Sequence, residues 1–202
     1  MVTSRRAEYS EATRRAILDS ATALFLEKGY AATSLDEVAA GARVTKGAVY
    51  HHFSSKRALY EALTEELEQR AVAVIVEVAA THESAWDGAV AGLDAFVQLC
   101  VDPTYSRLCF QEGPAVMGFE DWWRQGEVYF VALTQSMLEA LQRQGLIDTD
   151  DPEVLAQLLF GSVTAGALLL ARSPDPEALL PRVRSELLEF VGRFRRHAPP
   201  PP

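Results

Sequence analysis

The sequence predicts an all-α protein in which a three-helix helix-turn-helix head is followed by a longer helical body. Two observations indicate this fold class. Apolar residues recur at helical spacing throughout the 202 residues, and the alternation of apolar and polar residues that marks a strand is absent. Start and stop signals, namely capping side chains, prolines at first helical positions and terminal glycines, divide the chain into several helices.

The first helix is expected to cover residues 10–28. Ile17, Ala21 and Phe25 recur every fourth residue and therefore line one face. Gly29 follows directly and provides the stop, because glycine tolerates the left-handed conformation that commonly ends a helix.

Two short helices and a long one are expected next. Ser34 and Glu37 have the spacing of a capping box, which starts a short helix ending near Gly41. After a three-residue break, Thr45 is placed to cap a second short helix. Ser54 is expected to cap a long helix that reaches the high seventies.

The remaining helices form the body. Asp151-Pro152-Glu153 and Asp175-Pro176-Glu177 share one start signal, an acidic cap followed by proline at the first helical position. Pro181 is expected to restart or kink the last helix. The expected helices cover residues 84–101, about 103–110, 120–144, 153–172 and about 176–196, with an irregular stretch at 113–118.

Residues 154–171 contain no charge, which is near the lower limit for a membrane span. Gln157, Ser162 and Thr164 and the many small residues favour instead a helix buried between other helices or between subunits. We therefore expect no membrane partner.

Charge is distributed unevenly along the chain. The net charge is −9, yet residues 1–60 carry nine Lys and Arg against six Asp and Glu, whereas residues 61–202 carry ten against 22. A basic N-terminal part is compatible with nucleic acid at that end. Cys100 and Cys109 form neither a disulfide framework nor a metal motif, so we expect buried thiols, a cytoplasmic protein, no metal and no cofactor.

The second short helix carries the chemistry that points to function. Two short helices joined by a short turn form a helix-turn-helix unit. Polar groups suited to DNA lie between small residues, so the helix could enter a major groove. Lys56 lies in the first turn of the next helix, where a cation is unfavourable unless an anion such as a phosphate approaches. The residues of the expected recognition helix are Thr45, Lys46, Gly47, Ala48, Tyr50, His51 and His52.

Residues 33–39, residues 44–53, Lys56 and Leu59 closely resemble the N-terminal domain of the tetracycline-repressor (TetR-type) family. The resemblance covers about residues 10–60, and its Lys-Gly-x-x-Tyr-x-His-Phe core is highly specific. It implies a DNA-binding head, a helical ligand-binding and dimerisation body, and repression that a small molecule relieves.

The same resemblance assigns roles to individual residues. Lys46, Gly47 and Ala48 are expected to meet base edges, and His52 is expected either to contact phosphate or to brace the helix. The turn commonly has glycine where this chain has Arg43, so Arg43 is either strained at positive φ or part of a different turn in which it gains a phosphate contact. The expected phosphate contacts are Ser34, Thr45, Tyr50, His51 and Lys56.

The last two helices resemble the pair that forms the dimer interface of the family, and small residues there would permit close approach. Two-fold symmetry would place two recognition helices on the half-sites of a near-palindromic double-stranded DNA operator. The residues expected at this homodimer interface are Leu158, Gly161, Ala165, Leu169, Val183, Leu187, Val191 and Phe194.

An effector pocket is expected among the central helices, although aromatic and Met residues at helical spacing can equally be ordinary core. Apolar walls would suit a lipophilic ligand. The expected walls are Phe96, Leu99, Leu108, Met117, Trp123, Tyr129, Phe130 and Phe160, and the expected polar contacts are Tyr105, Gln111, Glu112 and Thr164.

The sequence thus predicts a DNA-binding head over residues 1–55, an effector-binding and dimerisation body over residues 56–198 and a disordered tail at 199–202. The predicted function is repression relieved by a small lipophilic ligand through a population shift. Two alternatives stay open: the same head controlled by a protein partner or acting as an activator, and a helical enzyme, although no catalytic constellation is visible in the sequence.

Overall fold

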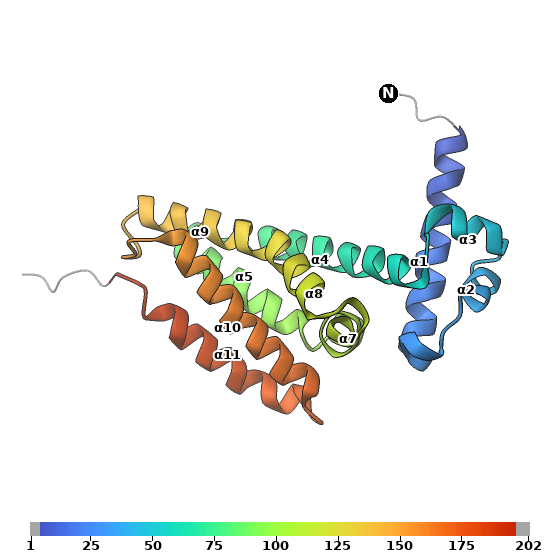
Figure 1. Ribbon diagram of the computed structural model, residues 1–202. Coiled ribbons are helices and arrows are strands. Elements are labelled where there is room, and N and C mark those ends of the chain that lie inside the picture. Colours follow the sequence, from blue (N-terminus) through green and yellow to red (C-terminus); the bar gives the residue numbers. More distant parts are fainter. Residues whose placement is uncertain (1–4, 197–202) are drawn as a thin grey trace, which may run out of the picture.

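The computed structural model describes residues 5–196, and of Arg5 and Arg6 it describes the backbone alone. Within this range the regular structure consists of helices joined by turns and short irregular segments, and one isolated bridge pairs Ile147 with Arg195. Figure 1 shows two parts: α1, α2 and α3 form a head, and α4, which runs away from it, leads into the body. The expected tail at 199–202 lies outside the described residues.

The head is built on one small apolar core. Its helices are α1 (Arg5–Ala32), α2 (Leu35–Gly41) and α3 (Lys46–His52). Phe25, Val38 and Val49, one from each helix, are fully buried. The first helix starts earlier than expected, at Arg5, and its regular run ends at Gly29 as predicted, because the non-helical φ of 82° there makes a kink before a short helical turn that reaches Ala32.

The body begins with α4 (Lys56–Ala80) and α5 (Ala85–Leu99). The prediction that Ser54 caps α4 is wrong, because the hydroxyl of Ser55 accepts the backbone N–H of Ala58 at 3.0 Å. The two helices approach closely where α5 has glycine. A Cβ at Gly88 would lie 2.7 Å from the carbonyl oxygen of Ala79.

Gly88→Ala should therefore lower the free energy of unfolding by about 1–3 kcal/mol, because the added methyl meets backbone that has no free rotamer to withdraw. Urea denaturation would measure the change. Gly192→Ala is the matched control, since a Cβ there meets no atom within 4 Å. That variant should be unchanged or slightly more stable. Equal stability of the two variants would contradict the close approach of α4 and α5.

The centre of the body contains two helical segments with widened π turns. Residues 103–117 are helical, so the expected irregular stretch at 113–118 is wrong except for Gly118, whose φ is 80°. The ring of Pro114 would clash with the fourth preceding carbonyl in a regular α-helix, and the π turn before it changes that spacing. The expected single helix at 120–144 also contains a π turn. The elements are α6 (Pro103–Tyr105), η1 (Ser106–Glu112), α7 (Gly113–Met117), α8 (Phe119–Gly126), η2 (Glu127–Val131) and α9 (Ala132–Arg143).

The last two helices, α10 (Pro152–Arg172) and α11 (Pro176–Gly192), lie side by side along one side of the body (Figure 1). Both start at the predicted acidic caps, where the carboxylates of Asp151 and Asp175 accept backbone N–H groups. Pro181 lies inside α11 without ending it, so the expected restart does not occur.

Candidate nucleic-acid interface and effector cavity

Helix α3 turns a polar surface away from the head. The side chain of Thr45 caps it by accepting the N–H of Ala48 at 3.1 Å, as predicted. Val49 is fully buried and Phe53, which follows α3, is also buried, so these two residues anchor the helix to the core. Tyr50 is 49% exposed on the opposite side. The other exposed residues of this surface are Thr45, Lys46, Gly47 and His51, and Ala48 is partly exposed.

The capping box of α2 forms as predicted. The Ser34 hydroxyl accepts the N–H of Glu37 at 3.2 Å, and the Glu37 carboxylate accepts the N–H of Ser34 at 2.8 Å. Lys28 of α1 also donates to that carboxylate. The hydrogen bonds from Lys28 and Ser34 lower the pKa of Glu37 to about 2. Ser34 is exposed, so its hydroxyl can still be approached from outside.

The turn between α2 and α3 holds Arg43 at a φ of 56°. Of the two possibilities for this position, the structure therefore shows a non-glycine residue in the left-handed region, which costs about 1–2 kcal/mol relative to a relaxed backbone. The Arg43 side chain is exposed next to α3. Lys46 reaches back across the turn, and its Nζ lies 2.8 Å from a carboxylate oxygen of Asp36.

His52 differs from its neighbours on α3. It is partly buried, and its ring lies next to those of His51 and Phe53. Partial burial, followed by the nearby charges of His51 and Arg14, lowers the pKa of His52, so it is neutral at pH 7. A neutral, partly buried ring favours the bracing role over direct contact with phosphate.

The argument that placed a phosphate at Lys56 is contradicted by the structure. Its Nζ donates to the carbonyl oxygens of Tyr30 and Thr33 at 2.8 Å and to that of Ala31 at 3.3 Å. It also lies 4.3 Å from the centre of the Tyr30 ring. These carbonyls stand at the C-terminal end of α1, the end of a helix that attracts a cation. The position of Lys56 is thus explained by partners within the chain.

Lys56→Met should lower the free energy of unfolding by about 2–3 kcal/mol, because three carbonyl groups lose a charged donor while the volume of the side chain is kept. Chemical denaturation would measure this loss. Lys46→Met is the matched control, since its ion pair with Asp36 is exposed and should leave stability nearly unchanged. Similar stability of the two variants would rule out the capping role.

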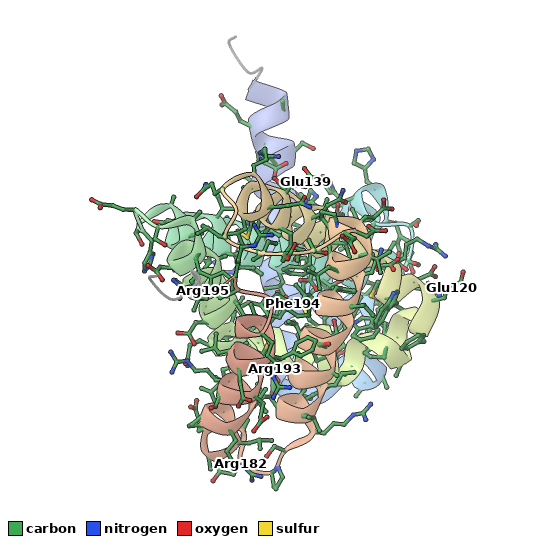
Figure 2. All side chains as sticks on the ribbon, turned by 90° about the vertical axis from the view of Figure 1, so that its left-hand side faces the viewer. Glu120, Glu139, Arg182, Arg193, Phe194 and Arg195 are labelled. Atoms are coloured by element: carbon green, nitrogen blue, oxygen red, sulfur yellow. The ribbon has the colours of Figure 1, made fainter. Side chains whose placement is uncertain are left out.

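The body contains a cavity of about 140 Å³ between α4, α5, η1, α8, η2, α9 and α10. Its wall is apolar and aromatic, and the chain near the end of α11 closes it far from the head. Figure 2 views the molecule from that end and shows Phe194 near the middle of it. Arg195 stacks over the ring of Trp86, and the N–H of Arg196 donates to Leu146. The aromatic lining residues are Trp86, Phe96, Phe110, Trp122, Trp123, Phe130, Phe160 and Phe194.

Five of the twelve expected pocket residues line this cavity: Phe96, Trp123, Phe130, Phe160 and Thr164. The others do not, for physical reasons that differ. Leu99, Leu108 and Met117 pack in the core beside it. Tyr129 faces outward and donates to Glu65. Tyr105 is buried behind the wall, Gln111 is exposed and Glu112 belongs to the junction with the head.

Sequence reasoning missed Glu68, the one ionisable residue among the described residues that line the cavity. It is 7% exposed, and its carboxylate accepts the Tyr105 hydroxyl at 2.5 Å and a hydrogen bond from the Cys109 thiol. Burial raises the pKa of Glu68 to about 7, and these two donors only partly oppose that effect. The sequence does contain a signal for Glu68, because it falls at helical spacing within the buried stripe of α4. The residues of this stripe include Tyr60, Thr64, Glu68, Ala71 and Ile75.

Segment η1 connects the cavity wall with the head. Phe110 lines the cavity. On the other side of the same segment, Arg107 donates to the carbonyl of Leu26 at 2.7 Å and pairs with Glu112 at 3.0 Å. Glu112 in turn accepts the N–H of Tyr30 at 2.8 Å. One short segment therefore touches both the cavity and the C-terminal end of α1.

An apolar face is exposed along α10. Leu158 and Leu169 are each 60% exposed, Ala165 is exposed and Gly161 is partly exposed, so four expected interface residues lie on one outward face. Val154 extends this face. By length and composition α10 could cross a membrane, and 44% of its most apolar window is buried within the subunit.

The expected interface residues on α11 are placed differently. Val183 and Leu187 are 8% and 9% exposed and pack against Gly166 of α10. Val191 and Phe194 line the cavity. Val183 and Leu187 thus join α11 to its own subunit, and contact between this stripe and a partner subunit stays a prediction. The exposed aromatic residue of α11 is Phe190.

Comparison with protein families gives two matches that together cover most of the chain. Residues 17–63 match the model described as bacterial regulatory proteins, tetR family, and residues 86–193 match the tetracyclin repressor-like C-terminal domain. Among curated proteins, the chain is 26% identical to the transposon Tn10 TetC protein of Escherichia coli over 76% of this chain and 78% of that protein. It is 31% identical to the A-factor receptor protein of Streptomyces griseus over 93% of this chain and 63% of the receptor.

Two further comparisons concern the head and the fold. A 45-residue stretch is 47% identical to the negative transcriptional regulator IcaR of the biofilm operon icaADBC in Staphylococcus aureus, covering 22% of this chain and 24% of IcaR. The structure resembles that of a TetR-family transcriptional regulator from Pectobacterium atrosepticum, with a TM-score of 0.84, 29% identity and coverage of 98% of this chain and 100% of that one.

Proposed function

The chain belongs to the tetR family of bacterial regulatory proteins and is a DNA-binding transcriptional regulator, and from this premise we propose that it is a cytoplasmic repressor released from its operator by a small lipophilic ligand. The observation that carries the ligand part is the aromatic cavity in the body, joined to the head by η1. The A-factor receptor, a relative by sequence, is by its name a receptor, which supports the same proposal.

We assign operator contact to the outward surface of α3. Lys46, Gly47 and Ala48 are proposed to meet base edges, because small residues let the helix lie deep in a major groove. Tyr50, His51 and Thr45 are proposed to contact phosphates, with Ser34 and Arg43 beside them. Lys56 and His52 are removed from this set, since one caps α1 and the other is a neutral brace.

The protein is proposed to act as a homodimer through the exposed face of α10. A two-fold axis along this face would set two α3 helices about 34–36 Å apart, which is the spacing of successive half-sites on a near-palindromic operator. We place the boundary between the head and the body at residues 55/56, where α4 begins.

The coupling is proposed to run through η1. A ligand that displaces Phe110 from the cavity wall would move η1. The same segment contacts α1, because Arg107 donates to Leu26 and Glu112 accepts from Tyr30. The ligand can release DNA only to the extent that it binds the displaced state more tightly.

Footprinting of the DNA upstream of the protein's own gene tests this function. The purified full chain should protect a near-palindromic site, and small lipophilic compounds that bind the cavity should remove the protection. Tyr50→Phe should weaken protection. It should also reduce the slope of the binding constant against salt concentration by about the amount that one phosphate contact contributes. A footprint that no cavity ligand changes would favour the alternative without a small-molecule effector, and no footprint at any site would reject self-regulation.

A further inference from the structure

The cavity contains one acid and no base. Of the described residues that line it, Glu68 alone is ionisable, and the other polar side chains are Thr134, Thr164 and the indoles of tryptophan. The two polar groups that contact Glu68, the Tyr105 hydroxyl and the Cys109 thiol, are both neutral donors. They can stabilise a carboxylate by hydrogen bonding, but neither neutralises its charge.

A buried carboxylate without a counter-ion is unfavourable, and a cation that enters the cavity would remove that penalty. The surrounding rings strengthen the argument, because aromatic faces attract cations. Phe96 packs against Phe130 with ring centres 5.0 Å apart, and Trp123 packs against Phe160 at 4.9 Å. All four rings belong to the wall that Glu68 completes.

The size of the cavity limits the ligand. An apolar protein cavity of about 150 Å³ holds one benzene molecule, and the cavity here is about 140 Å³. A single ring with a short substituent therefore fits, whereas a long acyl chain requires the walls to move.

We propose that the effector of this regulator is a small lipophilic amine, an organic cation with one ring or a compact alkyl body, whose ammonium group pairs with Glu68 while its apolar part contacts the aromatic wall. This inference rests on the proposed ligand-gated function and specifies the ligand. Neutral alcohols or phenols, which could donate to the same carboxyl, are the competing class.

Protonation of Glu68 gives the proposal a signature. Burial raises the pKa of each titratable group near Glu68, so these groups stay neutral between pH 6 and pH 8. They are Tyr105 of α6, Cys109 of η1, Cys100 at the end of α5 and Tyr129 of η2. Burial raises the pKa of Glu68 to about 7, so the carboxyl must lose its proton before it can pair with an ammonium group. The affinity for an amine should therefore rise about tenfold from pH 6 to pH 8.

Calorimetric titration of the full-length protein with three compounds of one shape tests the proposal. Benzylamine, benzyl alcohol and benzoate share a ring and differ in charge. Benzylamine should bind at least about tenfold more tightly than benzyl alcohol, and benzoate should not bind. Methylamine, which has the charge without the ring, should not compete, and this excludes binding at the acidic surface.

Glu68→Gln keeps the size and the acceptor for Tyr105 but removes the charge. This variant should lose benzylamine affinity at least about tenfold and lose its pH dependence, while benzyl alcohol binds as before. Thr164→Val, a change in the same wall without a change of charge, is the control and should keep the preference for the amine. If Glu68→Gln does not fold, the ranking of the compounds and the pH profile of the natural protein decide the question.

The outcomes separate this inference from the proposed function. Tighter binding of benzyl alcohol than of benzylamine, or amine binding that does not respond to pH, overturns the amine assignment. If a neutral compound then releases the operator, the proposed ligand-gated function stands although the amine assignment is wrong. If benzylamine binds as expected and the operator stays bound, the amine site stands and ligand gating falls.

Discussion

Leu158→Asp combined with Leu169→Asp should convert the dimer that we propose on α10 to a monomer. Both side chains are 60% exposed on α10, so the subunit loses little of its own core. Across a two-fold axis each new carboxylate would lie near its copy, and the apolar contact would be replaced by four negative charges in a protein whose net charge is already −9. Operator affinity should fall more than about 100-fold, because a monomer reaches one half-site only.

Sedimentation velocity together with an operator shift assay would measure both effects. Ala73→Asp combined with Ala132→Asp is the matched control, since both residues are exposed on other helices, α4 and α9, and the pair adds the same charge. The control should remain dimeric. A dimer that survives the α10 substitutions would place the contact between subunits on another surface.

Glu68→Gln should change the pH dependence of stability by about 3 kcal/mol. Burial raises the pKa of this carboxyl from 4.5 to about 7 in the folded state. Below pH 4.5 it is protonated whether the chain is folded or not, and its contribution to stability is fully present. Between pH 4.5 and pH 7 the unfolded chain releases the proton while the folded protein retains it, so the free energy of unfolding falls as the pH rises.

Urea denaturation at pH 5 and pH 8 would measure this difference. The free energy of unfolding of the natural protein should fall between pH 5 and pH 8. In Glu68→Gln most of that fall should be absent. Glu65→Gln is the control, because Glu65 is an exposed neighbour on the same helix and should leave the slope unchanged. A slope equal in all three proteins would mean that Glu68 is not the buried acid that the structure shows.

The elements that depend on neighbouring residues were predictable from the sequence. Ser34 with Glu37, Thr45, Asp151 and Asp175 all cap helices as predicted, because a cap is formed by side chains within a few residues of the groups they bind. The recognition helix was located to within one residue for the same reason. Its role follows from the family match rather than from geometry.

The features that depend on partners far along the chain were not predictable. The position of Lys56 suggested an external anion, whereas its partners are carbonyls of Tyr30 at the end of α1 and of Thr33 directly after it. Val183 and Leu187 form an apolar stripe that could face either a neighbouring subunit or the rest of its own, and helical periodicity does not distinguish the two. The packing of Val183 and Leu187 against Gly166 of α10 shows that both side chains face their own subunit.

The cavity shows the same limit. Tyr129 was expected in the wall and Tyr105 as a polar contact, yet both lie outside the cavity, while Phe110 and Glu68 line it. Which residue of a helix faces an enclosed space depends on the rotation of that helix, and the two π turns shift this rotation in ways that a regular helical period does not predict.

The widened turn of η1 has a consequence for insertions and deletions. Each residue of an α-helix advances the direction of its side chain by about 100°. Removing Gln111, the residue between Phe110 and Glu112, would turn these two side chains relative to each other by about that angle. Phe110 and Glu112 would then no longer point to the cavity and to α1 together. The coupling that we propose between the cavity and the head thus depends on the number of residues in this one turn, and a change of length there should uncouple them without removing either site.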